Sequence, residues 1–238
     1  MRACICLPTY NERENLEPML NALQSILGAD DRVLVIDDNS PDGTGQVAER
    51  LAGRLRNIEV LHRDHKDGLG PAYIAGFRRA LAEGAELVIE LDADFSHDPN
   101  DIPRLIEASK NADVVLGSRY VDGGSVENWG VVRRFVSLGG STYARVLLGT
   151  RLRDLTGGFK CFRRRVLETI DLDAVTAKGY AFQIELTYRA LRAGFTVREI
   201  PITFTDRVRG GSKMTRAIVL EAIWRVPLLR LAAVSGRM

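Results

Sequence analysis

The stretch LVIELDAD, residues 87–94, is an apolar run that ends in two aspartates separated by one residue. Short runs rich in aliphatic and β-branched residues are typical of strands buried on both faces of a sheet. Similar runs, with apolar residues at helical spacing between several of them, occupy residues 3–7, 33–37, 58–61 and 113–117. This β-α-β-α order predicts an α/β fold with a mostly parallel central sheet flanked by helices.

Polar residues follow three of these predicted strands, at 8–12, 37–44 and 92–94. Ligands of such sheets bind beyond the carboxyl ends of the strands. We therefore expect the three polar clusters to converge on one edge and to form the binding site.

The two aspartates at the end of the opening stretch, Asp92 and Asp94, are the sharpest signal. In an extended segment, residues two apart face the same way, so both carboxylates could bridge a divalent cation to a diphosphate. Hard oxygen ligands favour Mg²⁺ or Mn²⁺. The alternative interpretation is a strand-ending turn, because the turn-forming residues 98–100 follow.

A second acidic pair, Asp37 and Asp38, also follows a predicted strand. Carboxylates in this place can accept hydrogen bonds from ribose hydroxyls or from a base edge. The residues that follow, at 39–44, are also suited to a turn and a helix N-cap. We expect the two roles to be divided among different residues.

Several other classes of protein are disfavoured. The segment GLGPAY, residues 68–73, lacks the third glycine of a dinucleotide fingerprint and follows the third strand, which argues against a redox Rossmann enzyme. The chain contains no P-loop motif. A net charge of +2, from 33 basic and 31 acidic residues, is too balanced for a strongly basic nucleic-acid binder, so we expect no nucleic-acid partner.

The second half of the sequence is less regular. A glycine-rich stretch covers residues 122–140, a helix is predicted over 181–193, and alternating apolar residues predict a last strand over 200–204. No linker or internal repeat is present, so we expect one domain, 1–238. Its nucleotide-sugar half would run to about residue 120 and its acceptor half over about 121–238.

Basic residues lie in loops after the predicted strand ends: Arg119, Arg133, Arg134, Arg207 and Lys213. Any one alone could be a solvated surface charge. Flanked by glycines, several together could close over phosphate groups.

The cysteines and the two ends of the chain bear on its location. Cys4, Cys6 and Cys161 have no zinc-like or disulfide spacing, so we expect buried, reduced thiols. No secretory leader precedes the first strand, which predicts a cytosolic protein. Residues 217–234 are apolar but contain charged residues and Pro227, so we expect no membrane span. This segment is predicted to be an amphipathic helix that either contacts a membrane or packs in the core.

Taken in order, the motifs resemble those of the dolichyl/polyprenyl-phosphate mannosyltransferases, within the large inverting glycosyltransferase family. The resemblance runs nearly end to end. Most of its motifs are shared by many members of the large family, whereas KGYAFQ and the 206–213 segment are particular to the polyprenyl-phosphate group. The motifs are LPTYNE (7–12), IDDNSPDGT (36–44), DAD (92–94), GSRY (117–120), TGGF (156–159), KGYAFQ (178–183) and DRVRGGSK (206–213).

The resemblance implies a GT-A (nucleotide-diphospho-sugar transferase) fold, a GDP-mannose donor, a polyprenyl (dolichyl) phosphate acceptor, and Mg²⁺ or Mn²⁺. It places Asp94 and Ser96 at the metal; relatives often carry Gln where Ser96 stands, so the shorter side chain would leave that position to water. It places Arg133 and Ser137 at the acceptor phosphate. The catalytic residues that it implies are Asp92, Asp94, Arg119 and Arg133. The nucleotide sugar would be held by Pro8, Tyr10, Glu12, Ile36, Asp38, Asp92, Ala93, Asp94, Arg119, Arg207 and Lys213.

The expected reaction is transfer of mannose to the lipid phosphate with inversion. Two alternatives stay open: the same reaction with UDP-glucose or another nucleotide sugar, and a non-catalytic nucleotide-sugar-binding protein. The resemblance further implies work on the cytosolic face of a membrane, through a small membrane-protein partner or by peripheral docking. Glu185 is expected to have a structural or positioning role, because a phosphate acceptor needs no general base.

Overall fold

The computed structural model describes residues 2–177, 179–206 and 216–235. Its centre is a seven-stranded sheet with strand order β3-β2-β1-β4-β7-β5-β8. All neighbouring strands are parallel except β7, which runs antiparallel to both β4 and β5. The strands are β1 (Ala3–Thr9), β2 (Arg32–Asp37), β3 (Ile58–His62), β4 (Leu87–Glu90), β5 (Val114–Ser118), β7 (Lys160–Arg163) and β8 (Val197–Pro201).

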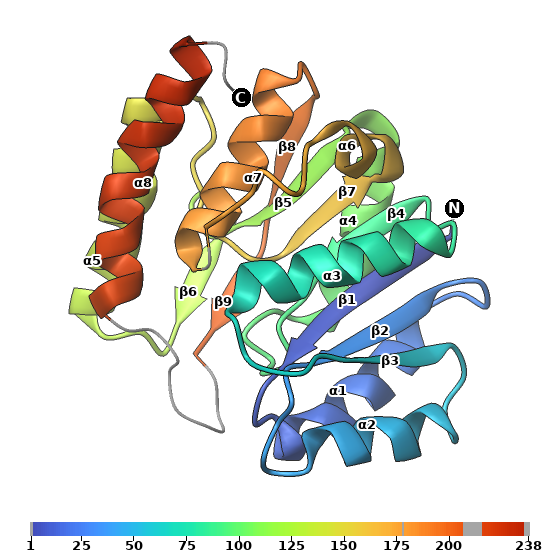
Figure 1. The fold of residues 1–238 in the computed structure, drawn as a ribbon. Coiled ribbons are helices and arrows are strands. Elements are labelled where there is room, and N and C mark those ends of the chain that lie inside the picture. Colours follow the sequence, from blue (N-terminus) through green and yellow to red (C-terminus); the bar gives the residue numbers. More distant parts are fainter. Residues whose placement is uncertain (1, 178, 207–215, 236–238) are drawn as a thin grey trace.

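Helices cover both faces of this sheet, which confirms the predicted fold class (Figure 1). One core lies between the sheet and α1, α2 and α4; the other lies between the sheet and α3, α6 and α7, with parts of α5 and α8. The helices are α1 (Arg13–Ile26), α2 (Thr44–Ala52), α3 (Leu69–Ala82), α4 (Ile102–Ala108), α5 (Val131–Leu148), α6 (Arg164–Thr169), α7 (Tyr180–Arg192) and α8 (Arg216–Val234), with short 3-10 turns η1 (Pro99–Asp101) and η2 (Ser109–Asn111).

Strand β1 explains why the sequences of the central strands are apolar at consecutive positions. Ile5 and Leu7 point into one core, whereas Cys4 and Cys6 point into the other. Both faces are therefore dry, and each residue of the strand has to be apolar. All three cysteines are buried and free, as the sequence predicted.

The glycine-rich stretch is more regular than expected, because helix α5 runs through Gly139 and Gly140. Each glycine costs a helix about 1 kcal/mol relative to alanine. The helix forms because Ala144 and Leu148 are buried in the core beside α7 and α8. Tertiary packing thus overrides the local propensity that the sequence displays.

The predicted last strand is also different, because residues 200–204 are shared between two sheets. β8 ends at Pro201 and pairs with β5, while β9 (Thr203–Thr205) pairs with β6 (Ser125–Glu127) in a separate two-stranded sheet. The apolar alternation is real, but the chain changes sheet at Ile202, whose N–H donates to Ser118 O at 3.1 Å.

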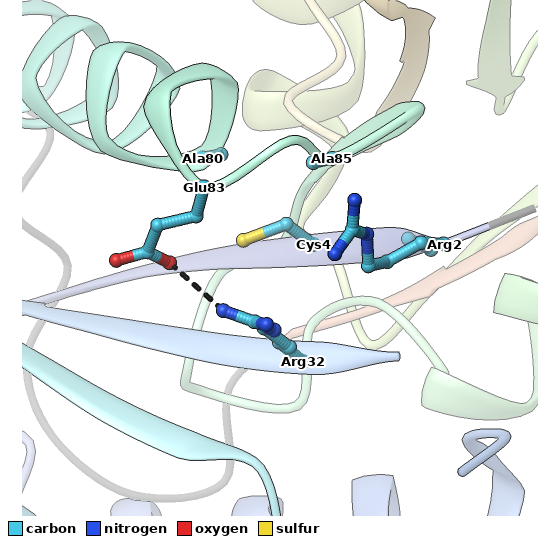
Figure 2. A pocket seen from close by; sticks show the side chains of 7 residues that line it. Arg2, Cys4, Arg32, Ala80, Glu83 and Ala85 are labelled. Carbon is cyan, nitrogen blue, oxygen red and sulfur yellow. Dashed lines mark hydrogen bonds and ion pairs between the residues drawn. The ribbon is translucent and has the colours of Figure 1, made fainter. Parts of the chain in front are cut away.

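A small hollow lies at the amino ends of β1 and β2, near Arg2 and Cys4 (Figure 2). Arg32 donates to Glu83 across its mouth at 3.3 Å. It has no room for a water molecule. Ligands of parallel sheets bind at the opposite, carboxyl ends of the strands, so we treat this hollow as a packing feature.

Candidate functional site

The three polar clusters lie at the carboxyl ends of β2, β1 and β4, which are neighbours in the sheet. Thr9 at the end of β1 is level with Asp37 at the end of β2. The predicted convergence on one edge is therefore confirmed. We call residues 8–12, 36–44 and 92–96 the strand-end site.

The loop after β2 is held by its own side chains. Asp37 accepts from Ser40 Oγ at 2.6 Å and from Thr9 Oγ1 at 3.2 Å. Asp42 accepts from the N–H of Thr44 at 3.0 Å, at the start of α2. These carboxylates fix the turn and the helix start, so they serve the structural role that the sequence allowed.

Asp38 differs from its neighbour Asp37. Its Oδ1 accepts from Arg63 Nη1 at 2.5 Å, and its side chain is nearly buried. Burial raises the pKa of Asp38 above its ordinary value, although the Arg63 guanidinium opposes that shift. Asp38 is thus a partly desolvated carboxylate outside the turn network, in keeping with the predicted ligand role. Arg63, which follows β3, had no signal in the sequence.

The other residues predicted at the nucleoside are placed unequally. Pro8 and Tyr10 are half-buried at the strand-end site, and Lys66 Nζ lies 4.0 Å from the centroid of the Tyr10 ring. Glu12 is buried at the start of α1, where its Oε2 accepts from Asn15 Nδ2 at 2.8 Å. The side chain of Ile36 is fully buried in the core, so a ligand could meet only its backbone.

The two aspartates of the opening stretch lie in a turn. β4 ends at Glu90, residues 93 and 94 are turn residues, and Phe95 has a φ of +59°. The alternation expected of an extended segment therefore does not apply to Asp92 and Asp94, because the strand stops before them. The Ser96 N–H donates to Asp94 Oδ1 at 3.0 Å and holds this turn. A non-glycine residue at positive φ is uncommon and is concentrated at functional sites.

The oxygen atoms at this turn could bind a hard cation only together with further oxygen ligands from a bound diphosphate or water. Within the described ranges, no three His, Cys, Asp or Glu side chains are grouped so that they could hold a metal by themselves. Mg²⁺ is commonly held by one or two carboxylates together with substrate phosphates. Asp92, Asp94 and the nearby Ser96 fit that pattern, with the remaining ligands coming from a diphosphate and water.

The segment GLGPAY forms the start of α3. Tyr73 is fully buried, and its hydroxyl donates to Asp92 Oδ1 at 3.3 Å. A Cβ on Gly70 would lie 2.5 Å from the carbonyl oxygen of Ala177, so only glycine allows this close approach to the segment before α7. The glycines here serve packing, which agrees with the rejection of a dinucleotide fingerprint.

Arg119 is a buried cation with a buried partner. Its Nε and Nη2 donate to the two oxygens of Asp154 at 2.7 and 2.6 Å, and Nη2 also donates to Thr156 Oγ1 at 2.9 Å. Burial favours the neutral form of Asp154, but the charge and hydrogen bonds of Arg119 outweigh it and lower the pKa of Asp154. This bidentate pair fixes the guanidinium in one orientation.

A second buried pair lies beneath the strand-end site. Glu90 and Lys160 face each other across β4 and β7, and Lys160 Nζ donates to Gln183 Oε1 at 2.6 Å. Burial raises the pKa of Glu90 to about 8 and lowers the pKa of Lys160 to about 8. The charge of Lys160 opposes the rise in the pKa of Glu90, and both carboxylate oxygens of Glu90 are buried without a hydrogen-bond partner in the described part of the chain. The buried side chains of Glu90, Lys160 and Gln183 are therefore polar and shielded from water, and Glu90 stands two residues before Asp92.

One stripe of α5 faces the sheet end. Arg133 Nη1 donates to Asp206 Oδ1 at 2.6 Å, Ser137 Oγ accepts from Tyr120 OH at 2.7 Å, and Ser141 Oγ lies 3.0 Å from Thr156 Oγ1. Positions four apart lie on the same helix face. The two residues predicted at the acceptor phosphate, Arg133 and Ser137, are therefore adjacent on that face.

Three predicted residues remain: Arg207, Lys213 and Glu185. Arg207 and Lys213 lie outside the described residues. Glu185 is buried in α7, where its Oε1 accepts from Arg189 at 2.8 and 2.9 Å. Its carboxylate is thus paired with a cation of its own helix.

The opposite stripe of α5 and the adjoining face of α8 are apolar and exposed. The two helices lie side by side (Figure 1), and Tyr143 OH donates to Ile223 O at 2.8 Å. In the described chain, no helix is long and apolar enough to cross a bilayer. We call this patch the α5–α8 surface; its large side chains are Val131, Val132, Phe135, Val136, Leu138, Tyr143, Val146, Ile223, Trp224, Leu228, Leu231 and Val234.

The geometry of the site agrees with a comparison of sequences. Residues 4–171 match the family model described as glycosyl transferase family 2. The chain is a family 2 glycosyltransferase. The strand-end site, including the carboxylate turn at residues 92–96, lies inside the region that matches the family model.

Two relatives of known name resemble this family 2 chain over nearly their whole lengths. It is 48% identical over 233 residues to an undecaprenyl-phosphate mannosyltransferase of Micrococcus luteus, covering 98% of this chain and 96% of that protein. It is also 48% identical over 227 residues to a polyprenol monophosphomannose synthase of Mycolicibacterium smegmatis, covering 94% and 85%.

Solved structures share the fold at lower identity. Glucosyl-3-phosphoglycerate synthase of Mycobacterium tuberculosis, in complex with phosphoglyceric acid, aligns with a TM-score of 0.69 at 18% identity, over 96% of this chain and 79% of that one. A mannosyltransferase of Pyrobaculum calidifontis, in complex with GDP-mannose and Mn²⁺, aligns with a TM-score of 0.59 at 15% identity, over 99% and 74%. These likenesses establish the GT-A fold.

Proposed function

We propose that this enzyme transfers mannose from GDP-mannose to a polyprenyl phosphate with inversion, giving polyprenyl phosphate β-mannose and GDP. The observation that carries the proposal is the 48% identity, over nearly full length, to two proteins whose names specify mannose and a polyprenyl or polyprenol phosphate. The undecaprenyl and polyprenol lipids in those two names support a polyprenyl phosphate as the acceptor class.

The strand-end site would bind the donor. Asp38 and the half-buried Tyr10 would contact the nucleoside, with Glu12 behind them at the start of α1. Asp92, Ala93 and Asp94 would face the diphosphate. A bound Mg²⁺ or Mn²⁺ would neutralise charge that develops on the departing diphosphate. Arg119 adds a cation whose orientation Asp154 fixes, and the resemblance adds Arg207 and Lys213.

The acceptor already carries the charge that it needs to react. A phosphate monoester has a second pKa of about 6, so at neutral pH it carries a charge of about −1.5 to −2 and presents an anionic oxygen. In the proposed step, that oxygen forms a bond to C1 of mannose, while the bond between C1 and the GDP oxygen breaks and its electron pair leaves with GDP. No proton has to be removed, so Glu185, paired with Arg189, is assigned a structural role.

The main electrostatic problem is then to bring two phosphate-bearing groups together, because like charges repel strongly where water is excluded. Fixed cations solve it at little reorganisation cost. Arg133 and Ser137, neighbours on the inner stripe of α5, would hold the acceptor phosphate. Arg119 and Arg133 would then lie on the donor and acceptor sides of the reacting atoms.

The α5–α8 surface supports peripheral docking on a membrane. Large apolar side chains gathered on an exposed surface mark interaction sites, and the proposed acceptor is a membrane lipid. Arg134 on α5 and Arg230 on α8 are exposed beside the patch and suit anionic head groups. We therefore prefer direct docking on the cytosolic face to a small membrane-protein partner.

The deciding experiment measures GDP release from GDP-mannose, with and without a short, soluble prenyl phosphate, in the presence of Mn²⁺ or Mg²⁺. We expect release that depends on the acceptor and yields an acid-labile lipid mannose. Faster turnover with UDP-glucose would replace the donor in this proposal. Tight GDP-mannose binding without any transfer would favour the non-catalytic alternative.

A further inference from the structure

Trp129 precedes Gly130, the N-cap residue of α5, and its indole ring lies near two arginine side chains. The guanidinium carbon of Arg133 lies 4.4 Å from the ring centroid, and that of Arg119 lies 5.6 Å from it. Both distances are within the range of cation–π attraction. Arg119 also lies 5.2 Å from the Tyr120 ring centroid and 5.5 Å from that of Phe204, so Trp129 is one of three rings near Arg119, and it is also in contact with Arg133.

The two arginines depend on this ring to different degrees. Arg119 is fixed by Asp154, which binds its Nε, Nη2 and backbone N–H, and by Thr156. The contacts described for Arg133 are the bond to Asp206 and the Trp129 ring. Loss of the ring should therefore disturb Arg133 far more than Arg119.

The ring and the carboxylate use different parts of the Arg133 guanidinium. A carboxylate or a phosphate binds the N–H edge of the group, whereas an aromatic ring binds its flat face. Asp206 is bonded to Nη1 alone, so a phosphate could bind other N–H groups of Arg133 or take the place of Asp206. The contact with Trp129 can persist in both cases, so the ring can hold the side chain in place while its anionic partner changes.

The ring itself is anchored to the core through a chain of aromatic contacts. Trp129 packs edge-on against Phe204 at 5.2 Å, Phe204 packs edge-on against His97 at 5.0 Å, and His97 packs against the fully buried Phe159 at 5.1 Å. His97 follows the carboxylate turn, and the adjacent Thr205 N–H donates to Ser96 O at 3.1 Å. Trp129 is thus placed relative to the strand-end site.

We propose that Trp129 is a positioning residue that holds Arg133 at the acceptor phosphate. The inference rests on the proposed function, because it takes Arg133 as the acceptor-phosphate residue. Trp129 acts through Arg133 and takes no part in bond making.

The test compares Trp129→Leu, which removes the ring, with Trp129→Phe, which keeps an aromatic face. Initial rates are measured while a soluble prenyl phosphate and GDP-mannose are varied in turn. We expect Trp129→Leu to raise the KM for the acceptor roughly 3- to 30-fold, the scale of a partly desolvated cation–π contact. The KM for GDP-mannose should stay within about twofold, and Trp129→Phe should recover most of the acceptor affinity.

A double variant separates positioning from general packing. If Trp129 acts through Arg133, Trp129→Leu combined with Arg133→Ala should have the same acceptor KM as Arg133→Ala alone. Additive effects, or a Trp129→Leu protein in which both KM values rise together, would overturn the inference. If Arg133→Ala leaves the acceptor KM unchanged, the acceptor site of the proposed function is wrong and the inference falls with it. If only Trp129→Leu is without effect, the inference alone is wrong.

Fluorescence gives a readout that does not depend on turnover. The chain has two tryptophans, Trp129 and Trp224, so in Trp224→Phe the emission comes from Trp129. Adding the soluble prenyl phosphate should change this emission, and Arg133→Ala should abolish the response. A constant emission at concentrations that saturate the Trp224→Phe enzyme would contradict the proposal.

Discussion

The strand-end site and the α5–α8 surface lie on the same molecule but are held in opposite ways. In the strand-end site, side chains bind the backbone of their own turns, as Asp42 does at Thr44 and Asp94 does at Ser96. On the α5–α8 surface, large side chains such as Val132 and Trp224 remain 78% and 73% exposed. The turns of the first region are held by hydrogen bonds within the protein, whereas the second region leaves large apolar side chains exposed, as interaction surfaces do.

The largest expected effect tests the strand-end site. Asp94→Asn removes an anionic ligand from the carboxylate turn and should lower turnover by about 10³-fold, the upper scale for loss of one transition-state charge partner. The matched control is Asp98→Asn, an exposed N-cap four residues further on, which asparagine serves equally well. Turnover is measured under limiting Mn²⁺. Equal activity of the two variants would remove Asp94 from the metal site.

Asp154→Asn probes the buried ion pair between Asp154 and Arg119. It leaves the Arg119 guanidinium buried without its counter-charge, which should cost about 3 kcal/mol in the free energy of unfolding. Urea denaturation at neutral pH measures this loss.

The same variant has a pH signature. The folded-state pKa of Asp154 lies below its ordinary value of 3.8. The pair therefore contributes stability that is fully present above that value and is lost as the pH falls through the folded-state pKa. Wild-type protein should lose stability in this acid range more steeply than Asp154→Asn. Parallel curves would show that Asp154 does not carry the linkage.

On the α5–α8 surface, Trp224→Glu should lower the rate about tenfold when the acceptor is embedded in vesicles with anionic lipid. With a soluble prenyl phosphate the rate should stay unchanged, because the surface lies outside the reacting site. Trp224→Phe, which keeps an apolar ring, is the control and should retain most of the vesicle activity. Equal losses with both acceptors would show that the residue supports the fold and does not dock on lipid.

The smallest expected effect concerns Glu185. Glu185→Gln should change turnover by less than about threefold, because the acceptor oxygen is already anionic. Glu168→Gln, which breaks a more exposed pair of the same i, i+4 type with Arg164, is a control for helix stability. A folded Glu185→Gln enzyme that is inactive and recovers as the pH is raised would identify Glu185 as a base.

The convergence of the three polar clusters could be predicted from the sequence because its information is local. Apolar runs identify β1, β2 and β4, parallel pairing brings their ends together, and the polar residues follow immediately. The sequence could not separate Asp37, which holds its own turn, from Asp38, because the partner of Asp38 is Arg63, which comes 25 residues later.

The second half is less predictable because its signals are long-range. β7 carries Lys160 and Arg163 and lacks the pattern of a central strand, yet it is inserted between β4 and β5, where Glu90 faces Lys160. The pair between Arg119 and Asp154 joins positions 35 residues apart. Trp129 gives no local signal either, because its role depends on rings and cations from other elements.

Helix α5 has a geometric consequence for substrate choice. Its inner stripe carries Arg133 and Ser137, while Phe135 and Val136 point outward on the same turns. A helix is only about 10 Å across. If the outer stripe enters the lipid, Arg133 and Ser137 would bind the phosphate at the level of the head groups, about one helix diameter from the hydrocarbon. Under the proposed docking, the tail could stay in the bilayer, so we expect lipids with the same head group and tails of different length to serve as acceptors.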